Sequence, residues 1–418
     1  MNILILNQYA LPRGAAGITR HGDLGSVLVS KGHKVTVIAS GFDYLTREID
    51  RTQGKLILQE THSGVDFFWL KTTPYKSNET KRTKSMVDYS INTAIKGLNL
   101  ADKPDVVIAS SPHLLTGLVG IFLSAYYQIP FVFEIRDLWP YVLVQLGAIK
   151  PNSFFHKTLN KIEKIIYKKS AKIIILSHFA GNYLKQIAVE KEKISYIPNG
   201  IFLNEKFKLA QNTLPDSLKS IIKAEKARKI IMYCGAHGIA NNLNNVLEAL
   251  DYLRNNKENI YNKIAVFFIG GGQQKDHLIK LAHQKKHSHV HFHPPVAKAV
   301  VKSALSYADI LLVHVADGFN YGISPNKLYD YLDAEKPILY SSAISNDIIE
   351  EIRAGITFLP NQPRELARAI ETMIFFPEEE RVSMAKRGKS YVREYHNLEK
   401  LGEKLEKILL EVISKEKR

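Results

Sequence analysis

Short apolar runs alternate with helical periodicities along the first half of the chain, and each run is long enough to cross a buried sheet. Helices are expected between these runs, for example at 19–30 and 85–98. The strands expected in this half cover 2–7, 34–39, 55–59, 66–70, 105–109, 131–134, 172–176 and 194–197. A strand, a helix and a parallel strand in that order form a right-handed βαβ unit, because only this hand packs the helix back on the sheet. The first half is therefore predicted to be a parallel α/β domain.

The second half repeats the pattern after Pro198-Asn199-Gly200, a turn made of three residues that interrupt regular structure. Its expected strands cover 229–234, 265–269, 290–292, 310–314 and 338–341. A chain of 418 residues is too long for one ordinary core. We therefore expect two consecutive parallel α/β domains. Their bounds are 1–197 and 198–377, and helices at 378–418 follow, the last of which packs back on the first domain.

Composition predicts a cytoplasmic protein with anionic partners. The chain has one cysteine, Cys234, no basic lead before its first apolar run, and no stretch near the roughly 20 apolar residues of a membrane span. The net charge is +16, and residues 1–200 carry 25 Lys and Arg against 15 Asp and Glu. A basic amphipathic stretch at 153–172 fits either an ordinary packed surface helix or a patch that binds the inner face of the cell membrane, and both interpretations stay open.

Candidate chemistry is concentrated at 318–337, where a loop of small residues runs into a short amphipathic helix. Ser324 is expected to cap this helix, with Pro325 in its first turn. Lys327 and Asp330 lie three residues apart, so they occupy neighbouring positions near the helix start. A helix N-terminus beside a lysine suits a diphosphate, and a carboxylate one turn further suits sugar hydroxyls. A capped surface helix explains the same stretch equally well.

Polar side chains also follow two expected strands of the first half. Ser110-Ser111-Pro112-His113 follows one strand, and the next ends in EIRDLWP, which contains Glu134, Arg136 and Asp137. Ligands of open α/β sheets bind at the carboxyl ends of the strands, so we favour a functional role for these charges over a structural ion pair. His113 has a second interpretation, as a histidine satisfied by backbone partners.

Several segments, taken together and in order, resemble glycosyltransferase family 4. Its members have the GT-B fold, in which two Rossmann-like domains face each other across a cleft, and they retain the configuration of the transferred sugar. The segments that carry the resemblance are PRGAAGITRHGDLGSVLVSKGHKVTVIAS, PFVFEIRDLWP, ISYIPNGI, the G-x-x-G at 235–238, FFIGGGQQKDHL and SPNKLYDYLDAEKPIL. EIRDLWP together with P-x-K-L-x-D/E-Y is similar to one branch, the L-fucosamine transferase-like enzymes of O-antigen and capsule biosynthesis.

The resemblance implies that the second domain binds a nucleotide-sugar, with UDP expected, and that the first domain binds the acceptor. Lys327 would neutralise the diphosphate, and Asp330 would bind ribose hydroxyls as the second acid of the family's E-x7-E motif. Arg136 would help to stabilise the leaving diphosphate, while Asp137 and His113 would position the acceptor or handle its proton. The other donor contacts are expected from Gly17, Gly238, Gly270, Gly271, Gly272, His293, Val296, Gly322, Ile323 and Ser324.

The sequence departs from the family's pattern in three respects. The first acid of E-x7-E falls on Gly322, and the Arg and Lys that many relatives place after the G-x-x-G strand fall on Ala236 and Asn241. The histidine that many relatives carry after the PFVFE-type strand falls on Arg136. The histidines are scattered along the sequence and no D-x-D triplet occurs, so we expect no metal cofactor.

The sequence thus predicts a retaining transferase of hexosyl or N-acetylhexosaminyl groups. Its expected acceptor is a glycan or a polyprenyl-diphosphate-linked saccharide of bacterial surface polysaccharide synthesis. Two alternatives stay open: a sugar-nucleotide 2-epimerase with the same two-domain plan, and a catalytically silent binding subunit of a polysaccharide assembly complex. Nucleic-acid binding is not indicated, because the basic residues do not alternate with aromatic ones in any readable motif.

Overall fold

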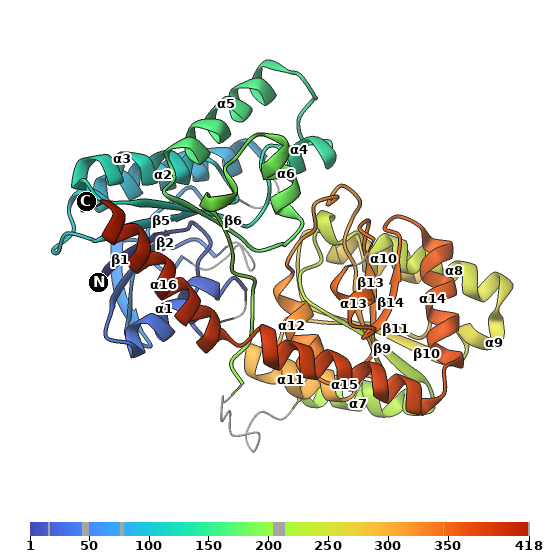
Figure 1. Cartoon of the computed structure of the whole chain (residues 1–418). Helices are drawn as coiled ribbons and strands as arrows, with labels where there is room; N and C mark the ends of the chain where they lie inside the picture. Colours follow the sequence, from blue (N-terminus) through green and yellow to red (C-terminus); the bar gives the residue numbers. More distant parts are fainter. Residues whose placement is uncertain (16, 44–49, 76–78, 204–213, 346, 417–418) are drawn as a thin grey trace. The chain divides into compact units, whose positions relative to one another are not determined.

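The structure is a computed structural model that describes residues 1–15, 17–43, 50–75, 79–203, 214–345 and 347–416. The chain divides into two compact units. Unit 1 comprises Met1–Asn199, Tyr321–Ser324 and Leu398–Arg418, and unit 2 comprises Gly200–Asn320 and Pro325–Asn397. Both units are α/β, and Figure 1 labels most of their helices and strands.

Unit 1 is built on an eight-stranded sheet. Its strands, in spatial order, are β3 (Ile57–His62), β4 (Val65–Leu70), β2 (Lys34–Ser40), β1 (Asn2–Leu6), β5 (Val106–Ser110), β6 (Phe131–Ile135), β7 (Lys172–Ile175) and β8 (Ile194–Tyr196). The edge strand β3 is antiparallel to β4, and the other pairs are parallel. Helices cover both faces of the sheet, so its central strands are continuous runs of Val, Ile, Leu and Phe. The chain order reverses between β1 and β5, which makes their carboxyl ends the switch point where such sheets bind ligands.

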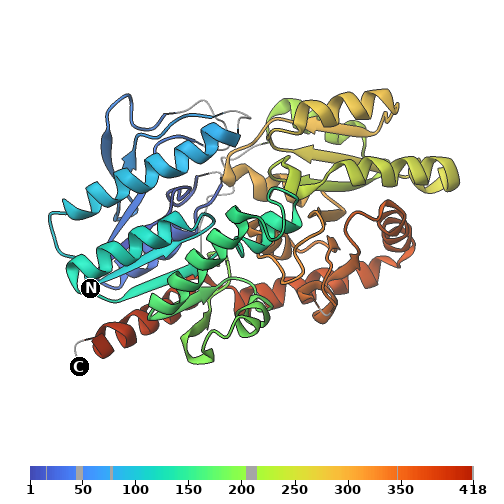
Figure 2. The ribbon, with the colours of Figure 1, turned by 90° about the horizontal axis from the view of Figure 1, so that it is seen from above.

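The helices of unit 1 form two layers. They are α1 (Arg20–Ser30), α2 (Glu79–Leu98), α3 (Leu115–Tyr127), α4 (Tyr141–Gln145), α5 (Phe154–Lys169), α6 (Ala180–Gln186) and α16 (Leu398–Glu416). α2, α3 and α5 lie side by side on one face of the sheet, as Figure 2 shows from above. α16 packs on α1 so closely that a Cβ at Gly402 would lie 2.4 Å from a methyl group of Val27.

Unit 2 is built on a six-stranded sheet in which the paired strands are parallel. Its strands, in spatial order, are β11 (Val290–His293), β10 (Ile264–Ile269), β9 (Lys229–Cys234), β12 (Ile310–Val313), β13 (Ile338–Ser341) and β14 (Gly355–Phe358). This is the strand order of the Rossmann fold, and its switch point lies between the carboxyl ends of β9 and β12.

Nine α-helices of unit 2 are described, and the last two, near its carboxyl end, are long. They are α7 (Asp216–Ala224), α8 (Asn244–Asn256), α9 (Glu258–Tyr261), α10 (Lys275–Gln284), α11 (Lys298–Ser306), α12 (Asn326–Asp333), α13 (Ile348–Glu351), α14 (Pro363–Phe375) and α15 (Glu378–Tyr395). α15 packs on α12, and a Cβ at Gly388 would lie 2.8 Å from Leu332 Cδ2. Therefore α15 belongs to unit 2 and α16 to unit 1, whereas the sequence analysis grouped both in one C-terminal segment.

Two of the differences from the sequence-based expectation have a local cause. β14 was not predicted, because it has four residues and begins with a glycine, which weakens the strand pattern. α2 begins at Glu79 rather than at 85, since the charged residues before Ser85 are good helix formers. Within the described part of the chain, no helix has the length and apolar character that a membrane span requires.

Candidate active site

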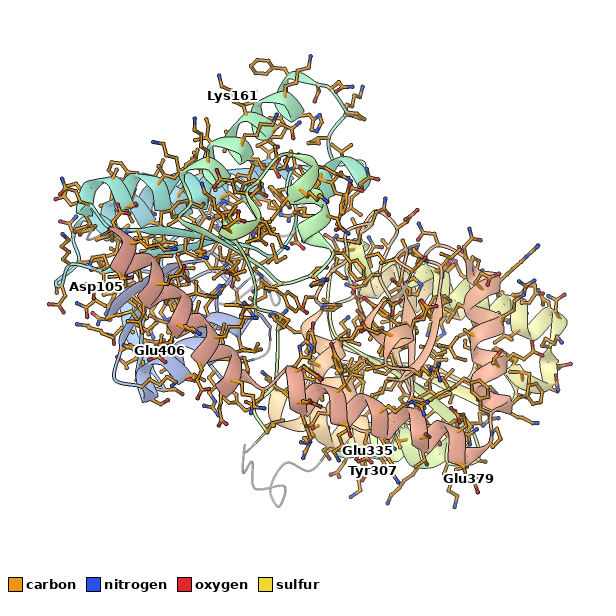
Figure 3. All side chains as sticks on the ribbon, viewed as in Figure 1. Asp105, Lys161, Tyr307, Glu335, Glu379 and Glu406 are labelled. Carbon is orange, nitrogen blue, oxygen red and sulfur yellow. The ribbon has the colours of Figure 1, made fainter. Side chains whose placement is uncertain are left out.

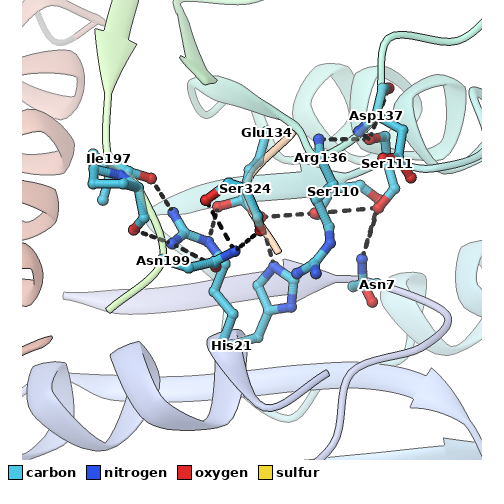
Figure 4. Close-up of polar contacts among 12 residues, drawn as sticks. Asn7, His21, Ser110, Ser111, Glu134, Arg136, Asp137, Ile197, Asn199 and Ser324 are labelled. Carbon is cyan, nitrogen blue, oxygen red and sulfur yellow. Dashed lines mark hydrogen bonds and ion pairs between the residues drawn. The ribbon is translucent and has the colours of Figure 1, made fainter. Parts of the chain in front are cut away.

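The carboxyl ends of β1, β5 and β6 meet at the switch point of unit 1, where hydrogen bonds hold the loops that leave the strands. Asn7 Nδ2 donates to the backbone oxygens of Ser110 at 3.4 Å and Ser111 at 3.0 Å. Ser111 Oγ accepts from the backbone N–H groups of Arg136 at 2.8 Å and Asp137 at 3.3 Å. These bonds, drawn in Figure 4, fix the backbone that carries two of the predicted site residues.

Glu134, near the end of β6, is the centre of a buried polar cluster. Its carboxylate accepts from Arg20 Nε at 2.8 Å and Ser110 Oγ at 2.8 Å, and lies 2.9 Å from His21 Nε2. Arg20, His21 and Glu134 are each 3% exposed, so the charges are almost fully removed from water. Burial opposes ionisation of Glu134, but the charges of Arg20, His21 and Arg136 together hold its pKa well below the ordinary 4.5.

The guanidinium of Arg20 also reaches the turn that ends β8. Its Nη1 donates to Pro198 O at 2.6 Å and its Nη2 to Ile197 O at 2.8 Å. Asn199 Nδ2 in turn donates to Ser324 O at 2.7 Å. The network therefore extends from Glu134 to the segment Tyr321–Ser324, which belongs to unit 1. Sequence analysis missed Arg20; the signal that points to it is its place in the first helical turn after β1.

Tyr321–Ser324 contains three residues that the sequence analysis assigned to donor binding. The Tyr321 ring packs against Tyr141 at 5.0 Å and Tyr183 at 5.3 Å between ring centroids. Ser177 Oγ donates to Tyr321 O at 2.9 Å. Gly322 has a φ of 71°, a left-handed conformation that costs other residues about 1–2 kcal/mol. The backbone of this chain therefore favours glycine at the position where relatives carry the first acid of E-x7-E.

Asp137 and His113 are both influenced by the charge of Arg82, but their surroundings differ. Burial raises the pKa of Asp137, although the charges of Arg136 and Arg82 oppose the rise. His113 is 2% exposed, and burial lowers its pKa to about 3. Thr116 Oγ1 lies 3.2 Å from its Nε2. These contacts favour the structural interpretation of His113, a neutral histidine held by local partners.

Gly17 lies in the loop between β1 and α1. The N–H of Leu11 donates to Ile18 O at 2.9 Å and closes this loop. Gly17 is exposed with a φ of 125°, so its backbone is accessible and a side chain there would be strained. A Cβ at Gly22 would lie 2.7 Å from Leu11 O, so a second glycine, not predicted, lets the loop rest on α1.

Lys327 lies at the switch point of unit 2. Its Nζ donates to Tyr233 OH at 2.5 Å and to Asn241 Oδ1 at 3.2 Å, and lies 4.0 Å from the Tyr233 ring centroid. Burial lowers the pKa of Lys327 from its ordinary 10.5 to about 7. A Cβ at Gly235 would lie 2.8 Å from Lys327 Nζ, so the first glycine of G-x-x-G makes room for the amine. Sequence analysis found Lys327 but not its partner Tyr233.

The glycines at 270–272 pack against the loop at 235–238. The N–H of Gly235 donates to Ile269 O at 2.9 Å, and the N–H of His237 donates to Gly271 O at 2.8 Å. A Cβ at Gly270 would lie 1.9 Å from Gly235 O, and one at Gly272 would lie 2.6 Å from His237 O. Two of these glycines are therefore required by loop packing, whatever ligand the loops bind.

His314, at the end of β12, supports the residues around Lys327. Its Nδ1 lies 2.8 Å from Asn241 O, and its Nε2 lies 2.9 Å from Asn245 Nδ2. Burial lowers the pKa of His314 to about 4, so the ring is neutral, donates from Nδ1 and accepts at Nε2. The predicted Gly238 lies in the same loop and accepts from the N–H of Asn241 at 3.0 Å. His314 thus holds the loop that supplies Asn241 to Lys327.

The start of α12 differs from the prediction by one residue. The helix begins at Asn326, so Pro325 occupies the N-cap position, and no side chain caps the helix. Ser324 was predicted as the cap, but it precedes Pro325 and accepts from Asn199 instead. The prediction was wrong because Pro325 has an extended ψ of 126° and is not yet helical. Asp330 lies half-buried one turn after Lys327.

The last two predicted donor residues are His293, which ends β11, and Val296, which follows it. His293 Nε2 lies 3.3 Å from Ser217 Oγ, and Val296 packs on the hydrophobic core of unit 2. Lys275, which sequence analysis missed, donates from Nζ to Gly270 O and to His293 O, both at 2.7 Å. This lysine links the glycine loop to the end of β11. Within the described residues, no group of three His, Cys, Asp or Glu side chains could hold a metal ion.

Two parallel α/β units, each with polar side chains collected at its switch point, are typical of sugar transferases with two Rossmann-like domains, and comparisons with known proteins agree. The chain is a GT-B glycosyltransferase. Residues 19–205 match the model of Glycosyltransferase Family 4, and residues 228–374 match that of Glycosyl transferases group 1. The GT-B fold expected from the motifs is confirmed, and the resemblance to family 4 is matched over residues 19–205.

Individual relatives are distant in sequence but similar in fold. The probable glycosyltransferase WbjE of Pseudomonas aeruginosa is 24% identical over 282 residues, which cover 66% of this chain and 68% of WbjE. Sucrose-phosphate synthase from Thermosynechococcus elongatus matches with a TM-score of 0.74 and 15% identity, over 99% of both chains. Anabaena HepE in complex with UDP matches with a TM-score of 0.66 and 13% identity, over 98% of this chain and 100% of HepE.

Proposed function

We propose that this protein transfers a sugar from a UDP-linked donor to a glycan or polyprenyl-diphosphate-linked acceptor in bacterial surface polysaccharide synthesis. The observation that carries the proposal is Lys327, an amine whose pKa burial lowers to about 7 at the switch point of unit 2. An amine with a pKa near neutral pH, placed at the carboxyl edge of a parallel sheet, is typical of functional sites. The fold shared with HepE, which has been solved with UDP and with UDP-glucose, supports a UDP-sugar donor.

In this proposal, unit 2 binds the donor. The diphosphate lies against Lys327, whose third N–H, once the amine is protonated, is available to a phosphate oxygen. Asp330, one turn along α12, accepts from the ribose hydroxyls. The base lies beside the glycine loops that include Gly238 and Gly270, with His293 at their margin. Because the loops are fixed by backbone hydrogen bonds, little reorganisation is needed when the donor binds.

The proposed chemistry follows from the charge that develops during transfer. The bond between the anomeric carbon and the diphosphate oxygen breaks, the diphosphate gains negative charge, and the sugar gains oxocarbenium character. An approaching diphosphate raises the pKa of Lys327, so the amine becomes fully charged where that negative charge develops. The acceptor hydroxyl bonds to the anomeric carbon on the face that the diphosphate leaves, and its proton passes to the departing phosphate. This scheme retains configuration and uses no metal.

Unit 1 binds the acceptor in this proposal. Arg136, which was expected at the leaving diphosphate, belongs to unit 1, and its guanidinium also matches a phosphate of a lipid-linked acceptor. Asp137, whose pKa burial raises, suits a hydrogen bond to the acceptor hydroxyl. The motif EIRDLWP supports a place in the L-fucosamine transferase-like branch, and hence transfer of a hexosyl or N-acetylhexosaminyl group. A polyprenyl-linked acceptor also implies work at the cytoplasmic face of the cell membrane.

The test is a thermal-shift screen of UDP-, GDP- and ADP-sugars, followed by mass spectrometry with and without a polyprenyl-diphosphate saccharide. We expect a UDP-sugar to stabilise the wild-type chain but not Lys327→Ala, and to lose its sugar to the acceptor. A mass-neutral change of the UDP-sugar without acceptor would identify a 2-epimerase. Absence of binding to every nucleotide-sugar would identify a silent binding subunit.

A further inference from the structure

The outer face of α5 carries a stripe of lysines with no acid among them. Lys157, Lys161, Lys164 and Lys168 recur at helical spacing and are all exposed. The one acidic residue of α5, Glu163, is 1% exposed and accepts from Tyr183 OH at 3.0 Å. Figure 3 labels Lys161 on this outward side of the helix. The stripe therefore presents an uncompensated positive charge.

A second lysine-rich helix of unit 1, α16, has a different arrangement of charge. On α16, the exposed Lys400, Lys404 and Lys407 alternate along the helix with acidic residues. These acids are Glu399, Glu403 and Glu406. The charges of α16 thus largely cancel, while those of α5 add to one field.

Two phenylalanines extend from the same helix into solvent. Phe154 and Phe155, in the first turn of α5, are 87% and 54% exposed. Ser153 Oγ accepts from the N–H of His156 at 3.2 Å, which fixes the start of the helix from which both rings extend. Aromatic rings beside lysines are the combination that favours the boundary between lipid headgroups and acyl chains.

The apolar surface continues on α3, which packs beside α5, and on α2, which packs beside α3. Val87, Ile91 and Ile95 recur every four residues along α2 and are 40%, 55% and 54% exposed. Phe122 and Tyr126 on α3 are 47% and 60% exposed. Figure 2 shows the three helices as one layer. One face of unit 1 thus combines an apolar stripe with a lysine stripe.

We propose that this face docks unit 1 on an anionic lipid bilayer. The docking face is defined by Phe154, Phe155, Lys157, Lys161, Lys164 and Lys168 on α5. Its lysines bind lipid phosphates, and its two rings insert at headgroup level. A water-soluble polyanion would pair with the lysines but would leave the rings in water, so the phenylalanines favour lipid. The inference deepens the proposed function, since a polyprenyl-linked acceptor is held in such a bilayer.

The test is sedimentation of the full chain with phosphatidylglycerol vesicles and with phosphatidylcholine vesicles. A variant with the four docking-face lysines changed to alanine is compared with a matched variant in which Lys400, Lys404, Lys407 and Lys415 of α16 are changed. Both variants lose the same net charge. We expect the α5 variant to lose about fivefold in binding per lysine, and the α16 variant to bind phosphatidylglycerol almost as the wild type does. In Phe154→Trp, tryptophan emission should shift to the blue when these vesicles are added.

Three outcomes would overturn the inference. They are equal loss in the two lysine variants, undiminished binding by the α5 variant, and binding to vesicles without any blue shift of Phe154→Trp. If vesicles bind without a blue shift, binding to dextran sulfate as strong as binding to phosphatidylglycerol vesicles would identify a soluble polyanion as the partner. A UDP-sugar thermal shift measured on the same variants keeps donor binding separate, because the docking face and Lys327 belong to different units.

Discussion

Changing Lys327 to methionine should stabilise unit 2 while it removes donor binding. Lowering a lysine pKa from 10.5 to about 7 corresponds to about 5 kcal/mol of unfavourable charge burial. Methionine removes that cost, but it leaves Tyr233 OH and Asn241 Oδ1 without their amine donor, at about 1–3 kcal/mol. We therefore expect a net gain of about 2–4 kcal/mol in the free energy of unfolding near neutral pH and below.

The sign of the pH dependence is opposite for stability and for donor binding. The folded pKa of Lys327 lies below its unfolded value, so above pH 7 the unfolded chain holds a proton that the folded chain has lost, and wild-type stability rises with pH. Donor binding needs the charged amine, so above pH 7 the donor affinity should fall by up to about tenfold per pH unit. Lys327→Arg, which stays charged, should show no such fall.

Calorimetry measures both effects. Trp69 and Trp139 are the two tryptophans of the chain, and both belong to unit 1, so fluorescence does not follow unit 2. Scanning calorimetry gives the stability of unit 2 in the wild type and in Lys327→Met. Titration of a UDP-sugar in two buffers of different ionisation enthalpy gives the proton taken up on binding. A wild type that takes up no proton above pH 7, or a methionine variant less stable than the wild type, would refute the reasoning.

Three further predictions concern the supports of the two sites. Glu134→Gln leaves the Arg20 guanidinium buried without its counter-charge, so unit 1 should lose about 3–5 kcal/mol in urea unfolding followed by tryptophan fluorescence. Wild-type unit 1 should lose the stabilisation from the Glu134–Arg20 ion pair as pH falls through the low folded pKa of Glu134. An unchanged urea midpoint in Glu134→Gln would contradict the stabilising role of this ion pair. Gly270→Ala, whose Cβ would lie 1.9 Å from a backbone oxygen, should lose about 3 kcal/mol or more by calorimetry, while the control Gly271→Ala, with 3.1 Å to a proline carbon, should lose less than about 1 kcal/mol. His314→Ala should weaken UDP-sugar binding by about tenfold in titration calorimetry, because two polar groups lose their partner at about 1–3 kcal/mol each; undiminished affinity would show that His314 does not support the donor site.

The strands were predictable where local pattern decides the structure. The expected 229–234 and 338–341 coincide with β9 and β13, because a sheet covered on both faces needs unbroken apolar runs. The motif at 318–337 placed Lys327 on a helix, as observed. The burial of Lys327 and its lowered pKa depend on residues distant in the sequence, so the local sequence pattern could not predict them.

The buried network of unit 1 could not be predicted in the same way. Arg20 and His21 in the first turn of a helix look like surface residues, and their partner Glu134 lies 114 and 113 residues away along the chain. The glycines at 270–272 show a second limit. Sequence reasoning assigned them to ligand approach, and the structure assigns two of them to loop packing; both roles rest on the missing Cβ, so composition alone does not separate them.

The division of the chain has a consequence for building hybrid enzymes. Unit 1 is completed by Tyr321–Ser324 and by Leu398–Arg418, which lie on the C-terminal side of the first boundary. A hybrid that joins residues 1–199 of this chain to the second half of a relative would replace Tyr321, Gly402 and Glu406 by foreign residues. It would thus lose the packing on Tyr141 and Val27 and the 2.7 Å contact of Glu406 with His33. Exchange of donor specificity therefore requires that both short segments be kept with the first half, so the transferable cassette is 200–320 together with 325–397.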